Sequence, residues 1–178
     1  FDLSYIINYD WWDYMKRVSL KPLEVSDAGE VYELCRGTFR EEYHITEERI
    51  LESLFEDPDF SAEESKKIVD EKNGRMIGFI GVKVSHNEQL YPASAWISIF
   101  AVKKEEQGKG YGTMVLNQVC QSLHKNGINK IYVGQDFNNF FSGIPDPDEG
   151  KEIFFKKNGF TLNRDRHFDL EADITDNR

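Results

Sequence analysis

Hydrophobic residues at helical spacing predict two helices in the first third of the chain. A short strand at Ser19–Pro22 leads to Asp27, which with Glu30 three positions later matches a capping box at a helix start. A second helix is predicted by Thr46 as its N-cap, two glutamates in the following turn and an apolar stripe. Pro58 ends this helix, because proline cannot continue the backbone hydrogen bonding.

The rest of the chain alternates between the spacing of strands and the spacing of helices. Asn73-Gly74 between two β-rich runs is a strong hairpin signal. The expected elements are a hairpin at 66–84, a buried strand at 94–102, a helix at 113–127, a strand at 129–136, a helix at 149–160 and a last strand at 166–174. Hairpins followed by a strand–helix–strand crossover predict an α/β fold, in which helices cover the faces of a mixed sheet.

Composition narrows the classes of partner. The chain has 178 residues, 39% of them apolar, which is enough for one buried core. Its 32 Asp+Glu against 22 Lys+Arg give a net charge of −10, which repels nucleic acid and anionic membranes. Such a surface favours amine substrates, although acidic surfaces also serve solubility alone. No apolar run approaches the roughly 20 residues of a membrane span, and without a signal peptide we expect a cytoplasmic location.

Cysteine and histidine give no pattern typical of a metal site or a nucleophile. Cys35 and Cys120 both lie in helix-like contexts with no adjacent histidine, which predicts two buried thiols rather than a disulfide. The four histidines are scattered without ligand spacing. The sequence therefore predicts no metal.

The first 16 residues do not continue the pattern of the rest. We expect a globular domain at 17–178 and an N-terminal extension at 1–16, which begins with Phe-Asp-Leu, a triplet that recurs at 168–170. If this repeat is meaningful, the extension contains the last strands of a preceding homologous domain. The extension contains Trp11, Trp12 and Tyr14, which are apolar enough to bind a partner surface, either a second copy of the chain or a tandem domain.

Three glycines at alternate positions precede the helix expected at 113–127. The backbone carries no side chains at Gly108, Gly110 and Gly112. At this point a helix start leaves N–H groups unpaired and partly positive. An anion can approach such a backbone closely. The spacing matches neither a nucleotide-triphosphate loop nor the dinucleotide fingerprint. Taken alone, the glycines indicate an anion site or simply a flexible turn.

In context, the stretch "FAVKKEEQGKGYG" resembles the acetyl-CoA signature of the GNAT N-acetyltransferases, Q/R-x-x-G-x-G/A, with Gln107, Gly110 and Gly112 at its fixed positions. "KNGINKIYVGQD" and "EIFFKKNGF" resemble later segments of the same family. The loop "FFSGIPDP" resembles a segment of tandem members, with Ser142 in place of a proline. The resemblance implies the GNAT fold, with a mixed, mostly antiparallel sheet whose strand 94–102 splays from the next strand.

The resemblance also implies acetyl-CoA as the cosubstrate. Backbone N–H groups from Gln107 to Thr113 would cradle its pyrophosphate, and the splayed strand would pair with its pantetheine amide. The backbone N–H of Val102 would polarise the thioester carbonyl. The cofactor-binding residues implied are Phe100, Ala101, Val102, Gln107, Gly108, Lys109, Gly110, Tyr111, Gly112, Thr113 and Phe155.

The implied reaction is direct transfer of an acetyl group to a primary amine. Such an amine must lose a proton, and Asp136, at the end of a predicted strand, is the candidate base. The segment Glu41, Glu42, Tyr43 and His44 is the candidate acceptor pocket. Phe155 replaces the tyrosine that protonates the leaving thiolate in many family members, so Tyr132 or Tyr111 would have to substitute.

Two other functions remain open at this point. The chain would be a non-catalytic acyl-CoA-binding or structural half of a tandem acetyltransferase if the missing tyrosine reflects lost activity. A nucleotide-binding module is disfavoured by the absence of the Lys-Ser/Thr pair and the ribose-binding acid. The sequence does not distinguish a polyamine, an aminoglycoside and a peptide amine as the acceptor.

Overall fold

The computed structural model describes residues 17–145 and 149–162. The chain divides into two units, with the boundary in the sequence between residues 145 and 146. The N-terminal extension at 1–16 and the last strand expected at 166–174 lie outside the described residues. Within the described residues no helix is long and apolar enough to cross a membrane.

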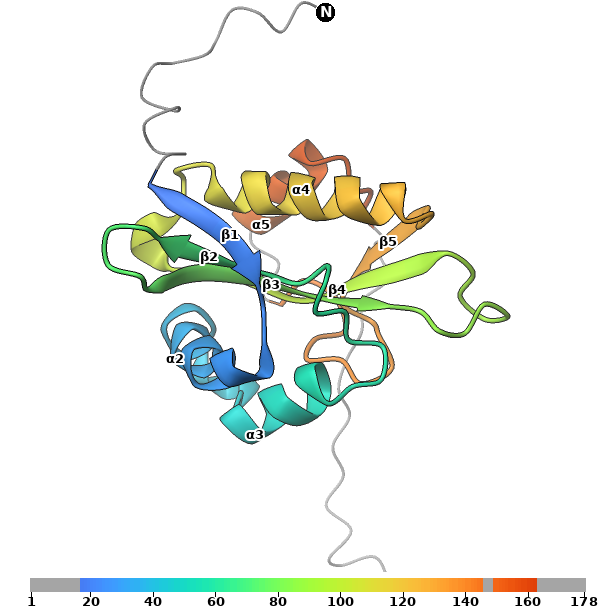
Figure 1. Ribbon diagram of the computed structural model, residues 1–178, viewed down its shortest axis with the longest axis horizontal. Coiled ribbons are helices and arrows are strands. Elements are labelled where there is room, and N and C mark those ends of the chain that lie inside the picture. The colour runs from blue at the N-terminus through green and yellow to red at the C-terminus, as the bar shows by residue number, and fades with distance from the viewer. Residues whose placement is uncertain (1–16, 146–148, 163–178) are drawn as a thin grey trace, which may run out of the picture. The chain divides into compact units, whose positions relative to one another are not determined.

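The first unit contains one sheet and its helices (Figure 1). Its elements are β1 (Val18–Pro22), α2 (Ala28–Thr38), α3 (Glu47–Ile50), β2 (Lys66–Asp70), β3 (Met76–Val84), β4 (Ser94–Val102), α4 (Tyr111–Lys125) and β5 (Lys130–Val133). A π-helical turn, Leu51–Phe55, continues α3. The second unit contains α5 (Glu149–Lys157).

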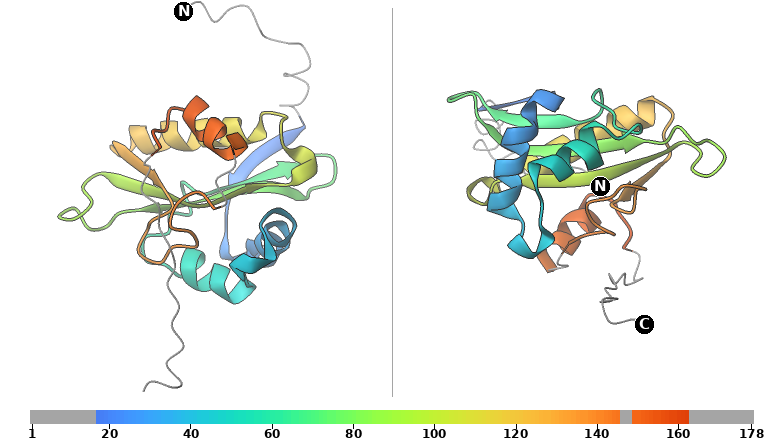
Figure 2. Two further views of the ribbon diagram at one scale, coloured as in Figure 1. Left: turned by 180° about the vertical axis from the view of Figure 1, so that it is seen from behind. Right: turned by 90° about the horizontal axis from the view of Figure 1, so that it is seen from below.

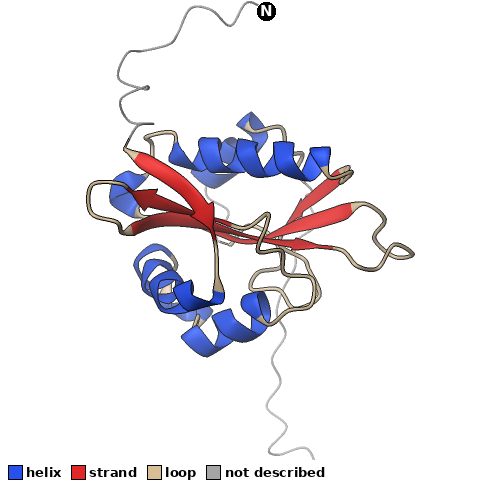
Figure 3. Ribbon diagram, in the orientation of Figure 1, coloured by secondary structure: helices blue, strands red, loops and turns tan. Residues whose placement is uncertain are grey.

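The five strands lie in the order β1-β2-β3-β4-β5. The first three pairs are antiparallel, and β4 and β5 are parallel. Within the first unit, α2 and α3 cover one face of the sheet and α4 covers the other, as Figure 3 shows by element type and Figure 2 from behind and from below. The expected mixed, mostly antiparallel sheet with helices on both faces is confirmed.

Burial on both faces explains why β3 and β4 are almost continuously apolar, since neither face meets water. On the α3 face, a Cβ atom at Gly81 would lie 2.8 Å from Leu54 Cδ1, so this glycine lets the π-helical turn pack closely on β3. On the α4 face, four apolar side chains of the helix are fully buried: Val115, Leu116, Val119 and Leu123.

The predicted capping box at Asp27 is wrong. Asp27 precedes α2, but its φ of −86° and ψ of −1° are helical, whereas a capping residue needs an extended conformation. Its carboxylate instead accepts the backbone N–H of Glu24 at 2.9 Å and the Lys67 ammonium at 2.6 Å. The expected cap at Thr46 is confirmed, since its hydroxyl accepts the N–H of Arg49 at 3.1 Å.

Candidate functional site

β4 and β5 separate halfway along β4. Their pairing ends at Ile97 and Val133, whereas β4 continues to Val102. On its other side, β4 pairs Ile97 with Val82 and Ile99 with Gly81, which leaves Ser98 as an extra residue in a β-bulge. A bulge bends its strand and increases the twist. The bulge therefore lies where the strands part, and we call this opening the fork.

The glycine-rich loop connects the end of β4 to the start of α4. The Gln107 side-chain amide donates to the carbonyl oxygen of Val102 at 2.8 Å, which holds the loop against the strand end. Gly108 (φ +75°) and Gly110 (φ +87°) both have the left-handed conformation that side chains disfavour. These two glycines reverse the chain so that α4 begins at Tyr111, two residues earlier than expected.

The start of α4 has the properties of an anion site. The first turn of a 15-residue helix directs N–H groups and about half a positive charge toward the loop. The Lys109 ammonium pairs with the Glu106 carboxylate at 2.8 Å, so its charge is shared rather than directed only at a ligand. The groups that this site offers an anion are therefore mainly those of the backbone.

The structure brings most of the predicted cofactor residues together. Residues 100–102 end β4, and residues 107–113 form the adjacent loop and the first turn of α4. Phe155 belongs to the second unit, where its buried ring contacts Phe154 at 5.2 Å and Phe160 at 5.5 Å between centroids. Its predicted role therefore stays a prediction.

Asp136 belongs to a buried ion cluster that the sequence analysis missed. Lys83 on β3 is 1% exposed, and its Nζ atom lies 2.5 Å from Asp136 Oδ1 and 3.0 Å from Asp57 Oδ2. Asp136 is 4% exposed, and its Oδ2 atom has no hydrogen-bond partner among the described residues. The signal available in the sequence was a single charged residue inside the apolar run of β3.

The loop after β5 is tied to both β3 and α3. Lys83 donates to the carbonyl oxygen of Asn138 at 3.2 Å, and the Asn138 side chain donates to the carbonyl oxygen of Glu52 at 3.0 Å. Arg49 donates to the carbonyl oxygen of Phe140 at 3.1 Å. These bonds fix the loop on the face of the sheet opposite α4.

The predicted acceptor segment lies against the same loop. Glu41–Tyr43 form one 3-10 turn, and His44 follows with a left-handed φ of +45°. The Tyr43 ring meets Phe141 edge to face at 5.1 Å, and Phe141 shares a core cluster with Ala101 of β4. The structure thus joins the acceptor segment, the loop after β5 and the end of β4 through packed side chains.

Neither cysteine has the character of a catalytic nucleophile. Burial raises the pKa of the Cys35 thiol to about 12, and it also raises the pKa of Cys120, which is partly exposed. Both thiols are free, but only Cys35 is buried, so the predicted burial of Cys120 is wrong. The described residues include no group of histidine, cysteine and carboxylate side chains that could hold a metal ion.

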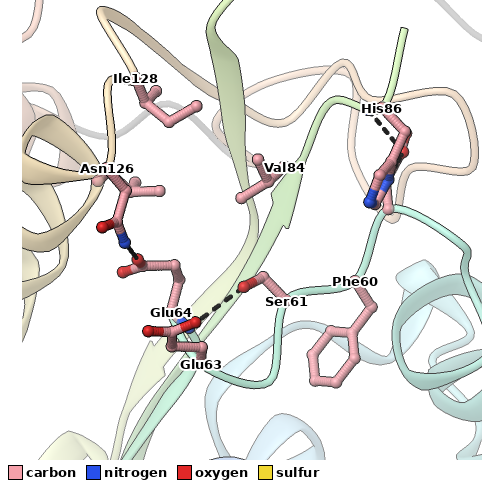
Figure 4. Close-up of a pocket in the computed structure, with 10 residues that line it drawn as sticks. Phe60, Ser61, Glu63, Glu64, Val84, His86, Asn126 and Ile128 are labelled. Atoms are coloured by element: carbon pink, nitrogen blue, oxygen red, sulfur yellow. Dashed lines mark hydrogen bonds and ion pairs between the residues drawn. The ribbon is translucent and has the colours of Figure 1, made fainter.

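A pocket of about 370 Å³ lies near the C-terminal end of α4 (Figure 4). Its wall includes Glu64, which accepts a hydrogen bond from the Asn126 side chain at 2.7 Å, and His86, whose ring pairs with Asp59 at 2.8 Å. Because α4 spans about 22 Å, this pocket is remote from the glycine-rich loop. None of the predicted site residues lines it.

Comparison with known proteins identifies the class. The model of the acetyltransferase (GNAT) family matches residues 28–142, so the chain belongs to this family. No curated protein matches the chain by sequence.

Solved structures share the fold. A GCN5-related glucosamine N-acetyltransferase region of a fungal multi-domain β-N-acetylglucosaminidase superposes with a TM-score of 0.71 and 21% identity. The match covers 83% of this chain but only 17% of that protein.

Two further structures match over most of their own length. An aminoglycoside acetyltransferase from an uncultured soil sample, in complex with trehalose, has a TM-score of 0.63 and 16% identity, and the match covers 89% of this chain and 98% of that one. The PaiA N-acetyltransferase from Thermoplasma acidophilum, in complex with coenzyme A, has a TM-score of 0.61 and 17% identity, with 84% and 92% covered.

Proposed function

We propose that the protein transfers an acetyl group from acetyl-CoA to a primary amine by direct transfer. One observation carries this proposal: the glycine-rich start of α4 lies beside the part of β4 that extends beyond β5. A backbone anion site thus lies next to an open strand edge with which a pantetheine chain can pair. Membership of the GNAT family supports the same reaction.

The cosubstrate is bound mainly by the main chain. Backbone N–H groups of the predicted segment from Gln107 to Thr113 hold the pyrophosphate, since they lie at the positive end of the α4 dipole. Within this segment the N–H of Gln107 donates to the Lys104 carbonyl oxygen at 3.3 Å, so residues 108–113 make the contacts. The main chain of residues 100–102 pairs with the pantetheine amide as a substitute strand. The N–H of Val102 polarises the thioester carbonyl, on which negative charge develops during attack.

The chemistry requires a neutral amine. Its nitrogen attacks the acetyl carbon, a C–N bond forms, the C–S bond breaks and the thiolate of CoA leaves. Asp136 takes the amine proton, directly or through a water molecule. Its Oδ1 atom is held by Lys83, so Oδ2 is the atom that accepts the proton. The thiolate is a tolerable leaving group unaided, because thiols have a pKa near 8.5.

The acceptor lies on the opposite face of the sheet from α4. Glu41 and Glu42 are exposed and attract a cationic amine to the segment that ends at His44. The structures similar to this chain include proteins named for acetyl transfer to glucosamine, to an aminoglycoside and to a ribosomal-protein alanine. All of these acceptors present an amine.

The competing function is a non-catalytic acyl-CoA-binding half. It is favoured by the engagement of Asp136 with Lys83 and by the absence of a hydroxyl at Phe155. Calorimetry with acetyl-CoA, followed by free-CoA release with a panel of amines, separates the two. Binding with turnover supports the transferase, whereas tight binding without turnover for any amine overturns it.

A pair of glycine variants locates the cosubstrate. Gly110→Trp places a bulky side chain where the diphosphate is held, and we expect its affinity for acetyl-CoA to fall at least a hundredfold. Gly127→Trp is the matched control, because Gly127 has a similar φ of +85° at the opposite end of the same helix and open space around it. Equal affinities in the two variants, measured by calorimetry, would place the cosubstrate elsewhere.

A further inference from the structure

Four aromatic side chains beside the fork form a chain of ring contacts. The Trp96 ring stacks on Tyr132 at 6.0 Å between centroids and meets Tyr91 edge to face at 5.1 Å. Tyr91 in turn contacts Phe137 at 5.5 Å. We call these four residues the aromatic shelf.

The outer rings of the shelf remain exposed. Trp96 is 3% exposed, whereas Tyr132 is 39% and Phe137 72% exposed. The buried Trp96 ring thus supports the exposed Tyr132 ring directly and the exposed Phe137 ring through Tyr91. Exposed aromatic rings that belong to one packed group indicate a binding surface more often than a single exposed apolar residue does.

Strand register places the shelf next to the reaction site. Trp96 pairs with Tyr132 one position before the last pair of β4 and β5, so the shelf adjoins the fork. Trp96 also pairs with Lys83, and paired residues share a face of the sheet. The Lys83 ammonium contacts the loop after β5, on the face opposite α4. A ligand on the shelf thus meets the fork from the face opposite the glycine-rich loop.

Backbone strain occurs on both sides of the shelf. Ala93, just before β4, has a φ of +46°, and Gln135, just after β5, has a φ of +64°. Side-chain-bearing residues adopt this conformation at a cost, and such strain is concentrated at functional sites. Among the described residues, only His44 in the predicted acceptor segment is another non-glycine residue with positive φ.

From these observations we propose that the aromatic shelf binds the acceptor and that the acceptor amine is carried on a saturated ring, as in an amino sugar. This inference rests on the proposed acetyl transfer. Aromatic faces attract an ammonium group and also pack against an apolar ring face. The nearby carboxylates of Asp57 and Asp136 are both engaged by Lys83, so a linear polyamine gains little from them.

The experiment compares acceptors and shelf variants. Free-CoA release is measured with glucosamine, spermidine and a peptide with a free N-terminus. We expect the highest kcat/KM with glucosamine, and a loss of about tenfold for glucosamine in Phe137→Leu and Tyr132→Leu, mainly through KM. Tyr32→Leu is the control, because this partly buried tyrosine lies on α2, outside the shelf. A preference for spermidine or the peptide, or shelf variants that match the control, overturns the proposal.

A binding measurement tests whether the aromatic shelf binds the acceptor even if no amine is acetylated. In a Trp11→Phe, Trp12→Phe background, the fluorescence of Trp96 reports on the shelf alone, since the chain has three tryptophans. Quenching by glucosamine that is lost in Tyr132→Leu supports the shelf even if acetyl transfer fails. Absence of quenching in the unsubstituted shelf overturns it, whatever the turnover.

Discussion

The two faces of the sheet offer a ligand different kinds of groups. On the α4 face, the glycine-rich loop offers N–H groups and a helix dipole, and its two left-handed glycines keep side chains away. On the α3 face, the features are side chains: the Lys83 ion cluster, the aromatic shelf and the loop after β5. The α4 face suits a cosubstrate that is the same throughout a family, and the α3 face suits an acceptor that differs from one member to another.

The difference explains which parts of the site the sequence predicts. A backbone site needs glycines at fixed spacing beside a helix start, and this pattern is local in the chain. A side-chain site is assembled from distant segments: Asp57, Lys83 and Asp136 span 79 positions and meet only in the fold. The predictions that best test this difference between the two faces therefore concern residues of the α3 face.

The largest effect is expected for Asp136→Asn. If Asp136 accepts the amine proton, the variant lowers kcat by about 10²–10⁴-fold, while the affinity for acetyl-CoA on the other face is unchanged. Asp57→Asn is the matched control, since it also removes one carboxylate from Lys83 and leaves the other. Initial rates of CoA release measure both, and similar kcat values in the two variants would exclude Asp136 as the base.

Most of the fold could be predicted from the sequence because its signals are local. The bounds of β4 follow from a mostly apolar run, and Thr46 caps α3 as expected. The cap predicted at Asp27 was wrong because the Asp27 carboxylate is engaged outside α2, by the N–H of Glu24 and by Lys67 on a strand 40 positions away. The sequence also gives no signal for the bulge at Ser98, since the bulge depends on how two strands pair.

The next effect concerns the stability of the α3 face. Lys83→Met leaves the carboxylates of Asp57 and Asp136 buried without their ammonium partner, and we expect the free energy of unfolding to fall by about 3–5 kcal/mol. Adding Asp57→Asn and Asp136→Asn should recover much of this loss, because no unpaired charge remains. Urea unfolding measures each variant. A Lys83→Met protein as stable as the parent would show that the cluster is not the anchor of this face.

The smallest effect is expected at Gly134, where the chain leaves β5. A Cβ atom there would lie 2.6 Å from the carbonyl oxygen of Phe141, and the residue has a φ of +66°. Gly127 has a φ of +85° but open space, so Gly127→Ala isolates the cost of the left-handed backbone, about 1–2 kcal/mol. Gly134→Ala adds a steric clash of about 1–3 kcal/mol and displaces the loop that positions Asp136. We therefore expect Gly134→Ala to lower both stability and kcat beyond the control without weakening acetyl-CoA binding, since the clash is confined to the α3 face. Equal unfolding free energies and equal kcat in the two variants would mean that the loop adapts freely and does not hold Asp136 in place.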